Sequence, residues 1–125
     1  MSANLLPPSS EAPAPVLGCD TPQKLWRMRC RQWADSPALR HKKKGIWHTI
    51  SWADYYQQAR AVALALRHWG LKPGETVAIL AENRPEWLYA DMGAQALGLI
   101  GVGLYPTASP EQVAFILRDS RARVL

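Results

Sequence analysis

The residues best placed to do chemistry follow an apolar stretch, LIGVGLY (99–105), which leads into Tyr105-Pro106-Thr107. A continuous apolar stretch is typical of a strand covered on both faces, as in a parallel sheet. Ligands of open α/β sheets bind where such strands end. Thr107 brings a hydroxyl and free backbone groups to that edge. Tyr105, Pro106 and Thr107 are therefore the candidate ligand-binding loop, although an ordinary βα-loop without a ligand is the favoured interpretation.

Two glycines inside this stretch, Gly101 and Gly103, resemble the start of a dinucleotide-binding fingerprint. That fingerprint needs its glycines after the strand, where a helix begins. Here both glycines fall within the predicted strand, and the next helix signal comes later. We therefore predict that the glycines allow a neighbouring element to pack closely against the strand.

The preceding apolar run, TVAILA (76–81), ends at Glu82, Asn83 and Arg84. These side chains are expected at the same edge of the sheet. Asn83 or Arg84 is predicted to serve the start of the next helix, and a ligand role for Arg84 is the alternative.

The remaining residues that could do chemistry show no functional spacing. His41, His48 and His68 are predicted to be surface or packing residues, and Cys19 and Cys30 to be free thiols, since they form neither a CxxC pair nor a metal-ligand pattern. No catalytic residue and no metal site is predicted. The six tryptophans recur on helix stripes and in a predicted hairpin, and are expected in the core.

The elements that must position these loops alternate in type. A helix is expected from the Thr21-Pro22 cap to about Ala34, followed by a hairpin with Lys44-Gly45 in its turn. Ser51 then begins a long amphipathic helix that ends at Gly70. Further along, strands and helices are predicted at 76–81, 85–97, 99–105, from Ser109 onward, and at the final RVL.

This alternation predicts an α/β fold with a partial parallel sheet and flanking helices, preceded by a helix and a β-hairpin. The few strands and helices expected here can hardly cover the apolar helix at 85–97. We therefore expect an incomplete N-terminal subdomain, truncated on its C-terminal side, within a larger unit. A complete small α/β domain with a short last strand is the alternative.

The net charge of +5 resides in the N-terminal part of the chain. Residues 1–44 hold eight Lys and Arg against three acids, whereas residues 45–125 hold seven of each. No nucleic-acid-binding motif accompanies this charge, so nucleic acid is not expected as a partner. The basic residues are interpreted as a solvated helix face and a hairpin tip, and a peripheral membrane contact through this segment is the alternative. Residues 1–18, rich in Pro, Ser and Ala, are predicted to be a disordered leader and not a secretory signal.

Three segments resemble the AMP-forming acyl-CoA synthetases of the adenylate-forming superfamily. ISWADY (50–55) is similar to the first core motif of that family, GLIGVGLYPTASPEQVAFIL (98–117) to the second, and NRPEW (83–87) to a strand-to-helix turn. The resemblance covers about residues 20–125. GIWHTISW (45–52) most resembles the long-chain fatty acyl subgroup. Residues 19–125 are thus identified as the N-terminal part of an AMP-dependent synthetase/ligase domain.

The resemblance implies a ligase that uses ATP, Mg²⁺ and coenzyme A. A carboxylic acid would be activated as an acyl-adenylate and then transferred to the thiol of coenzyme A. Tyr105-Pro106-Thr107 would lie beside the pantetheine arm of coenzyme A. The family's phosphate loop, acidic residues and lid lysine have no counterpart here, so the fragment alone is expected to be inactive and to bind no cofactor.

The same resemblance implies small-molecule substrates and fatty acid metabolism. The two free thiols are typical of a reducing cytoplasm, so a cytoplasmic location is expected, with a position peripheral to the inner membrane face as an option that the basic segment offers. A stand-alone α/β interaction or nucleotide-binding module without ligase activity is the alternative function.

Overall fold

The computed structural model describes residues 16–125. Most of the predicted disordered leader, residues 1–15, lies outside the described residues. At its end the backbones of Val16 and Cys19 pair through hydrogen bonds of 3.0 and 2.9 Å, which close a tight turn. The domain boundary near residue 18 stays a prediction.

The first described elements are a helix and a hairpin, as expected. Helix α1 (Pro22–Gln32) begins at Thr21, whose side-chain oxygen accepts a hydrogen bond from the Lys24 amide at 3.3 Å. Strands β1 (Pro37–Lys43) and β2 (Ile46–Ser51) pair antiparallel. Their turn has φ of 49° at Lys44 and 81° at Gly45, the left-handed conformations that two-residue hairpin turns require.

Helix α2 (Trp52–His68) begins where the sequence predicts. The Ser51 hydroxyl oxygen accepts a hydrogen bond from the Asp54 amide at 3.0 Å and satisfies one of the free N–H groups of the first turn. Gly70, at φ 82°, ends the helix in the left-handed region, which costs glycine no steric strain. Tyr55, Ala59 and Leu66 form the buried stripe of this helix.

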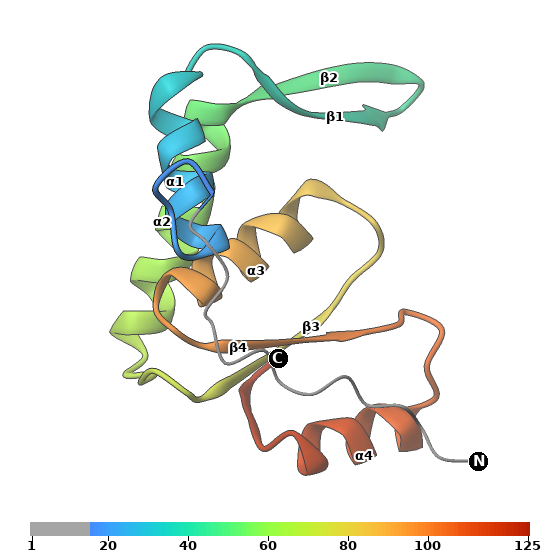
Figure 1. The fold of residues 1–125 in the computed structure, drawn as a ribbon. Helices are drawn as coiled ribbons and strands as arrows, with labels where there is room; N and C mark the ends of the chain where they lie inside the picture. Colours follow the sequence, from blue (N-terminus) through green and yellow to red (C-terminus); the bar gives the residue numbers. More distant parts are fainter. Residues whose placement is uncertain (1–15) are drawn as a thin grey trace, which may run out of the picture.

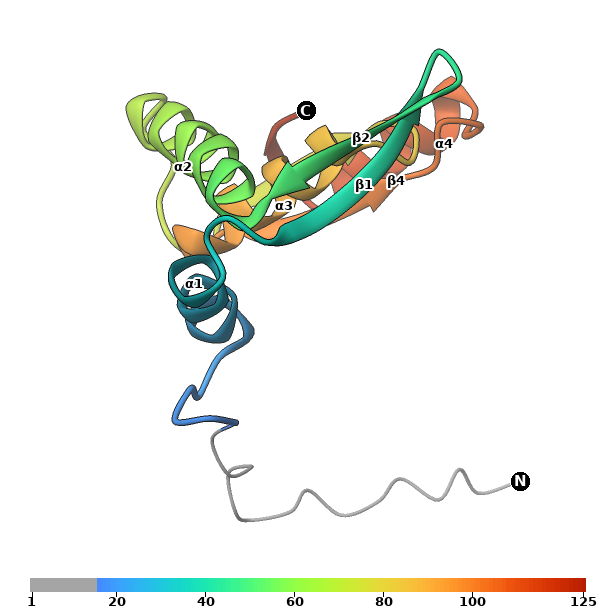
Figure 2. The same cartoon turned by 90° about the horizontal axis from the view of Figure 1, so that it is seen from above.

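The sheet confirms the predicted fold class. Strands β3 (Thr76–Leu80), β4 (Ile100–Leu104) and β5 (Ala122–Val124) are parallel, in the order β4-β3-β5. Helix α3 (Pro85–Ala96) lies on the same side of the sheet as α2, and α4 (Pro110–Asp119) lies on the opposite side (Figure 1). In the view of Figure 2 the β1–β2 hairpin crosses over α3, and α1 packs against α2.

The core lies between α2, α3 and β3. Leu66, Val77, Ala94 and Leu99 form its buried cluster. Gly93 brings α3 very close to α2: a Cβ there would lie 2.7 Å from the Ala59 carbonyl oxygen and 2.9 Å from Val62 Cβ. These two helices therefore pack through a residue that has no side chain.

Strand β4 differs from the prediction that it is buried on both faces. Ile100 is 52% exposed, and only Leu104 is buried. Among residues 16–125, β4 pairs with β3 alone and stands at the sheet edge, so one side has no neighbour. The prediction for its glycines is confirmed, because a Cβ would lie 2.8 Å from Asp91 Oδ1 at Gly101 and 3.1 Å from the Trp87 ring at Gly103.

The tryptophans are also less buried than expected. Trp33, Trp47 and Trp69 are 46%, 65% and 63% exposed, so their expected place in the core is wrong. Trp33 and Trp69 cap the ends of α1 and α2, and Trp47 lies near the end of the hairpin. At these positions few other elements come within reach.

Candidate functional site

An open cleft of about 550 Å³ lies where β3 and β4 end. Its walls come from the two loops that follow these strands and from the first turn of α3. They comprise Ala81, Glu82, Asn83, Trp87, Leu88 and residues 103–106. The cleft therefore occupies the edge at which ligands of parallel sheets bind.

The predicted loop brings two of its three residues to this cleft. Tyr105 and Pro106 line it, and Tyr105 is 81% exposed. Thr107 is exposed but is not among the lining residues. The Ala108 amide donates to the Tyr105 carbonyl at 3.0 Å, which closes the loop into a turn. The geometry leaves the ligand role of Tyr105, Pro106 and Thr107 a prediction.

The described residues that line the cleft are largely apolar, and none of them is basic. Trp87, Leu88 and Tyr105 give it apolar walls, and Gly103 lets the Trp87 ring approach the strand. Of the described residues that line it, none is Lys or Arg, and Glu82 adds negative charge. A phosphate would therefore meet no cation from these residues.

Arg84 stands at the N-cap position of α3, yet its side chain makes no capping hydrogen bond. It donates instead from Nε to Glu86 Oε2 at 2.8 Å and from a terminal nitrogen to Oε1 at 2.9 Å. This two-pronged hydrogen bond lowers the pKa of Glu86 to about 2. The guanidinium is thus held beside its own helix, and a ligand would have to compete with Glu86 for it.

A second open cleft, of about 590 Å³, separates the hairpin from the start of α3. On the hairpin His41 and His48 are cross-strand partners, and their ring centroids lie 5.4 Å apart. Sequence reasoning treated these histidines separately. Their equal distance from the Lys44-Gly45 turn was the signal that could have paired them. Within residues 16–125 no group of three metal-binding side chains is present, so the pair lacks a third ligand.

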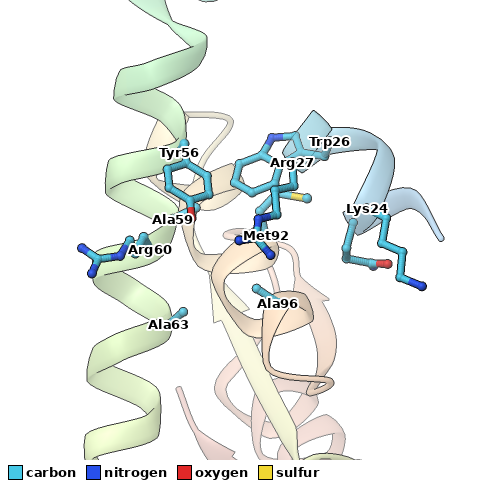
Figure 3. A pocket seen from close by; sticks show the side chains of 10 residues that line it. Lys24, Trp26, Arg27, Tyr56, Ala59, Arg60, Ala63, Met92 and Ala96 are labelled. Carbon is cyan, nitrogen blue, oxygen red and sulfur yellow. The ribbon is translucent and has the colours of Figure 1, made fainter. Parts of the chain in front are cut away.

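A third pocket, of about 350 Å³, lies between α1, α2 and α3. Figure 3 shows Trp26, Tyr56 and Met92 around it, with the guanidinium of Arg27 reaching across the space between them. Trp26 packs edge-on against Tyr55 with ring centroids 5.2 Å apart. The pocket therefore combines apolar walls with three basic side chains, those of Lys24, Arg27 and Arg60.

Two buried titratable groups on the neighbouring helices, the Cys30 thiol on α1 and the Tyr55 hydroxyl on α2, are not suited to catalysis. Burial raises the pKa of the Cys30 thiol to about 11 and that of the Tyr55 hydroxyl to about 12. Both groups therefore stay protonated at neutral pH. A protonated thiol is a weak nucleophile, and neither group can act as a general base.

Comparison with known proteins identifies the class to which this fold and its motifs belong. The family model described as AMP-binding enzyme matches residues 26–125. The chain therefore belongs to the AMP-binding enzyme family, which confirms the resemblance seen in its sequence.

Individual relatives narrow this class. The chain is 39% identical over 94 residues to the long-chain-fatty-acid–CoA ligase ACSBG1 of Bos taurus. The aligned stretch covers 75% of this chain and 13% of the relative. The chain is 26% identical to the fatty acyl-adenylate ligase from L. pneumophila, solved with acyl adenylate and pyrophosphate, with a TM-score of 0.77 over 86% of this chain and 20% of that one.

The fold itself matches a solved N-terminal subdomain, that of Klebsiella oxytoca NpsA. The TM-score is 0.74 at 20% identity, over 83% of this chain and 26% of the subdomain. The chain thus spans about an eighth of the bovine ligase and about a quarter of the NpsA subdomain.

Proposed function

We propose that this chain forms the N-terminal part of an ATP-dependent acyl-CoA ligase that acts on a long-chain fatty acid. The single observation that carries the proposal is the 39% identity to a long-chain-fatty-acid–CoA ligase. In the reaction, the carboxylate attacks the α-phosphate of ATP and releases pyrophosphate. The thiol of coenzyme A then attacks the acyl carbon of the adenylate and displaces AMP.

Within that enzyme the cleft at the end of β3 and β4 would face coenzyme A. Its apolar walls and its lack of a free cation among the described residues support a contact with the pantetheine arm, and not with ATP. Tyr105 and Pro106 would line the path of the arm, and Thr107 would lie beyond it. ATP and Mg²⁺ would be held by parts of the enzyme that this chain does not supply.

The chain alone is proposed to be inactive. Its sequence contains no Ser/Thr/Gly-rich loop that ends in Lys, which the family uses to hold phosphates. Without such a loop to place positive groups at the phosphates, the adenylation step would lack the neutralisation of charge that accelerates it.

A graft into a relative tests the proposal. The matching 94-residue stretch of the bovine ligase is replaced by the corresponding residues of this chain. Pyrophosphate release that depends on a long-chain fatty acid, and acyl-CoA formation, are then measured. We expect the graft to retain both activities, and the isolated chain to show neither.

The control graft carries Leu66→Ala, which weakens the core without touching the cleft at the strand ends. A well-folded graft that forms no acyl-CoA would contradict the proposal. Tight binding of ATP or AMP by the isolated chain would instead favour a stand-alone nucleotide-binding module.

A further inference from the structure

The end of the β1–β2 hairpin presents its side chains to solvent on both faces. Figures 1 and 2 show the two strands extending away from α2, against which their base packs. Leu39 and Ile50, near that base, are half-buried. Ile46 and Trp47, near the turn, are each 65% exposed. We call residues 42–47 the hairpin tip.

Cross-strand pairing gives each face of the tip the same chemistry. Lys42 stands opposite Trp47, and Lys43 stands opposite Ile46. Directly opposed residues share a face of the ribbon, and successive pairs point to opposite faces. Each face therefore carries one lysine beside one large apolar side chain. Lys42 Nζ lies 6.0 Å from the Trp47 ring centroid, within reach of a cation–π contact.

The positive charge of the tip is not neutralised by its own element. Residues 37–50 contain Arg40 and Lys42–Lys44 but no Asp or Glu. The ion pairs found within residues 16–125 do not include these lysines. Across the neighbouring cleft stand Glu82 and Glu86, and Glu86 is already bound by Arg84. The lysines are thus available to an external anion.

We propose that the hairpin tip docks end-on into the headgroup region of an anionic lipid bilayer. Lys42, Lys43 and Lys44 would bind lipid phosphates, and Ile46 and Trp47 would enter the boundary between headgroups and acyl chains. Tryptophan favours that boundary because one end of its ring is apolar and the other donates a hydrogen bond. Lysines contribute through their attraction to anionic lipids.

The two apolar side chains distinguish a bilayer from a nucleic acid. A polyanion would use the lysines, but it offers the exposed Ile46 no apolar surface to enter. A bilayer accommodates both the charge and the aliphatic group. The inference depends on the hairpin alone, and it stands or falls independently of ligase activity.

Vesicle binding of the 125-residue chain tests the charged part of the proposal. Partitioning is measured on phosphatidylcholine vesicles with and without phosphatidylglycerol. The variant Lys42→Thr/Lys43→Thr/Lys44→Asn keeps strand formers on β1 and, at the turn, a residue that tolerates positive φ. We expect binding only with the anionic lipid, and about hundredfold weaker binding in the variant.

A charge-matched control separates the tip from the overall charge. Arg60→Ala/Arg67→Ala/Lys72→Ala removes three exposed cations that lie outside the hairpin. This control is expected to change partitioning by less than about threefold, since its cations would not touch the membrane. Equal losses in both triple variants, or no binding by the unmodified chain, would overturn the proposal.

The apolar part is tested by fluorescence. The difference in emission between the chain and Trp47→Phe isolates the signal of Trp47, and Trp69→Phe is the control because Trp69 is 63% exposed. Brominated lipid acyl chains are expected to quench the Trp47 signal and to leave that of Trp69 unchanged. Quenching of Trp69 alone, or lysine-dependent binding to duplex DNA without binding to vesicles, would also overturn the proposal.

Discussion

The two faces of the sheet are covered to very different degrees. On one face α2 and α3 pack against β3 and against each other, so that Leu66 and Ala94 are 4% and 0% exposed. On the other face α4 has no buried residue, and its Phe115 is 66% exposed. The helices that cover the two faces, α2 and α3 on one and α4 on the other, are similarly rich in apolar residues. The difference lies in how many neighbours each helix has.

This contrast shows that the formation of a helix and its burial depend on different interactions. Helix α4 has a complete capping box, in which Ser109 and Gln112 satisfy each other's backbone amides. It also turns its apolar Val113, Ile116 and Leu117 partly inward. Local signals therefore suffice to start and orient α4, but only contacts with other elements bury a helix.

The largest effect is expected from the core residue Leu66. Leu66→Ala removes a buried side chain between α2 and β3 and should lower the free energy of unfolding by about 3 kcal/mol. Phe115→Ala on α4 should change it by less than about 0.5 kcal/mol, because that ring is already in water. Urea unfolding measures both. Similar losses would mean that α4 is as well packed as α2.

A second test uses the two close approaches of glycine. At Gly93 a methyl group would meet the backbone oxygen of Ala59, which cannot move without separating α2 from α3. At Gly101 it would meet the carboxylate of Asp91, which can rotate away. We expect Gly93→Ala to cost about 2 kcal/mol and Gly101→Ala less than about 1 kcal/mol.

Thermal or urea unfolding of the two glycine variants checks this expectation. A larger loss for Gly101→Ala would show that the β4 side, and not the α2–α3 contact, is the more tightly packed.

Removing the N-caps of α2 and α4 should affect the stability of the whole fold in one case and of a single helix in the other. Ser51→Ala and Ser109→Ala each remove a side-chain acceptor from a first turn, worth about 1 kcal/mol. For α2 the loss should appear in global unfolding. For α4 it should appear mainly as faster amide hydrogen exchange within the helix. The Thr variants at both positions keep the acceptor and serve as controls.

The smallest effect concerns pH. Glu86 has its pKa lowered to about 2 by Arg84, so the pair stabilises the folded chain above about pH 4.5. That contribution is lost as the pH falls from about 4.5 to 2. Because both side chains are well exposed, we expect no more than about 0.5 kcal/mol. Glu86→Gln should flatten this part of the stability curve, and an unchanged curve would contradict the assignment.

The sequence predicted those features that depend on neighbouring residues in the chain. Ser51 and Ser109 begin helices because their side chains accept hydrogen bonds from amides three residues away. Lys44-Gly45 forms the hairpin turn because glycine accepts a positive φ. The capping role considered for Arg84 failed for an equally local reason. A helix start needs an acceptor, and a guanidinium has only donors.

Burial could not be predicted in the same way. The runs TVAILA and LIGVGLY are both continuous and apolar, yet β3 lies in the centre of the sheet and β4 at its edge. Strand order depends on contacts between distant segments, and no short pattern encodes it. The position of the candidate loop, by contrast, does not depend on strand order. A βα-loop directly follows its strand in the sequence, so the sequence placed it correctly at a strand end.

The order β4-β3-β5 also has a consequence for folding. The middle strand, β3, lies nearer along the chain to β4 than to β5, so its pairing with β4 closes the shorter loop and costs less conformational entropy. Until β5 pairs, the central strand has one ladder of hydrogen bonds open, and any unpaired strand could attach there. We expect pulse-labelled hydrogen exchange during refolding to protect the amides shared by β3 and β4 before those shared by β3 and β5.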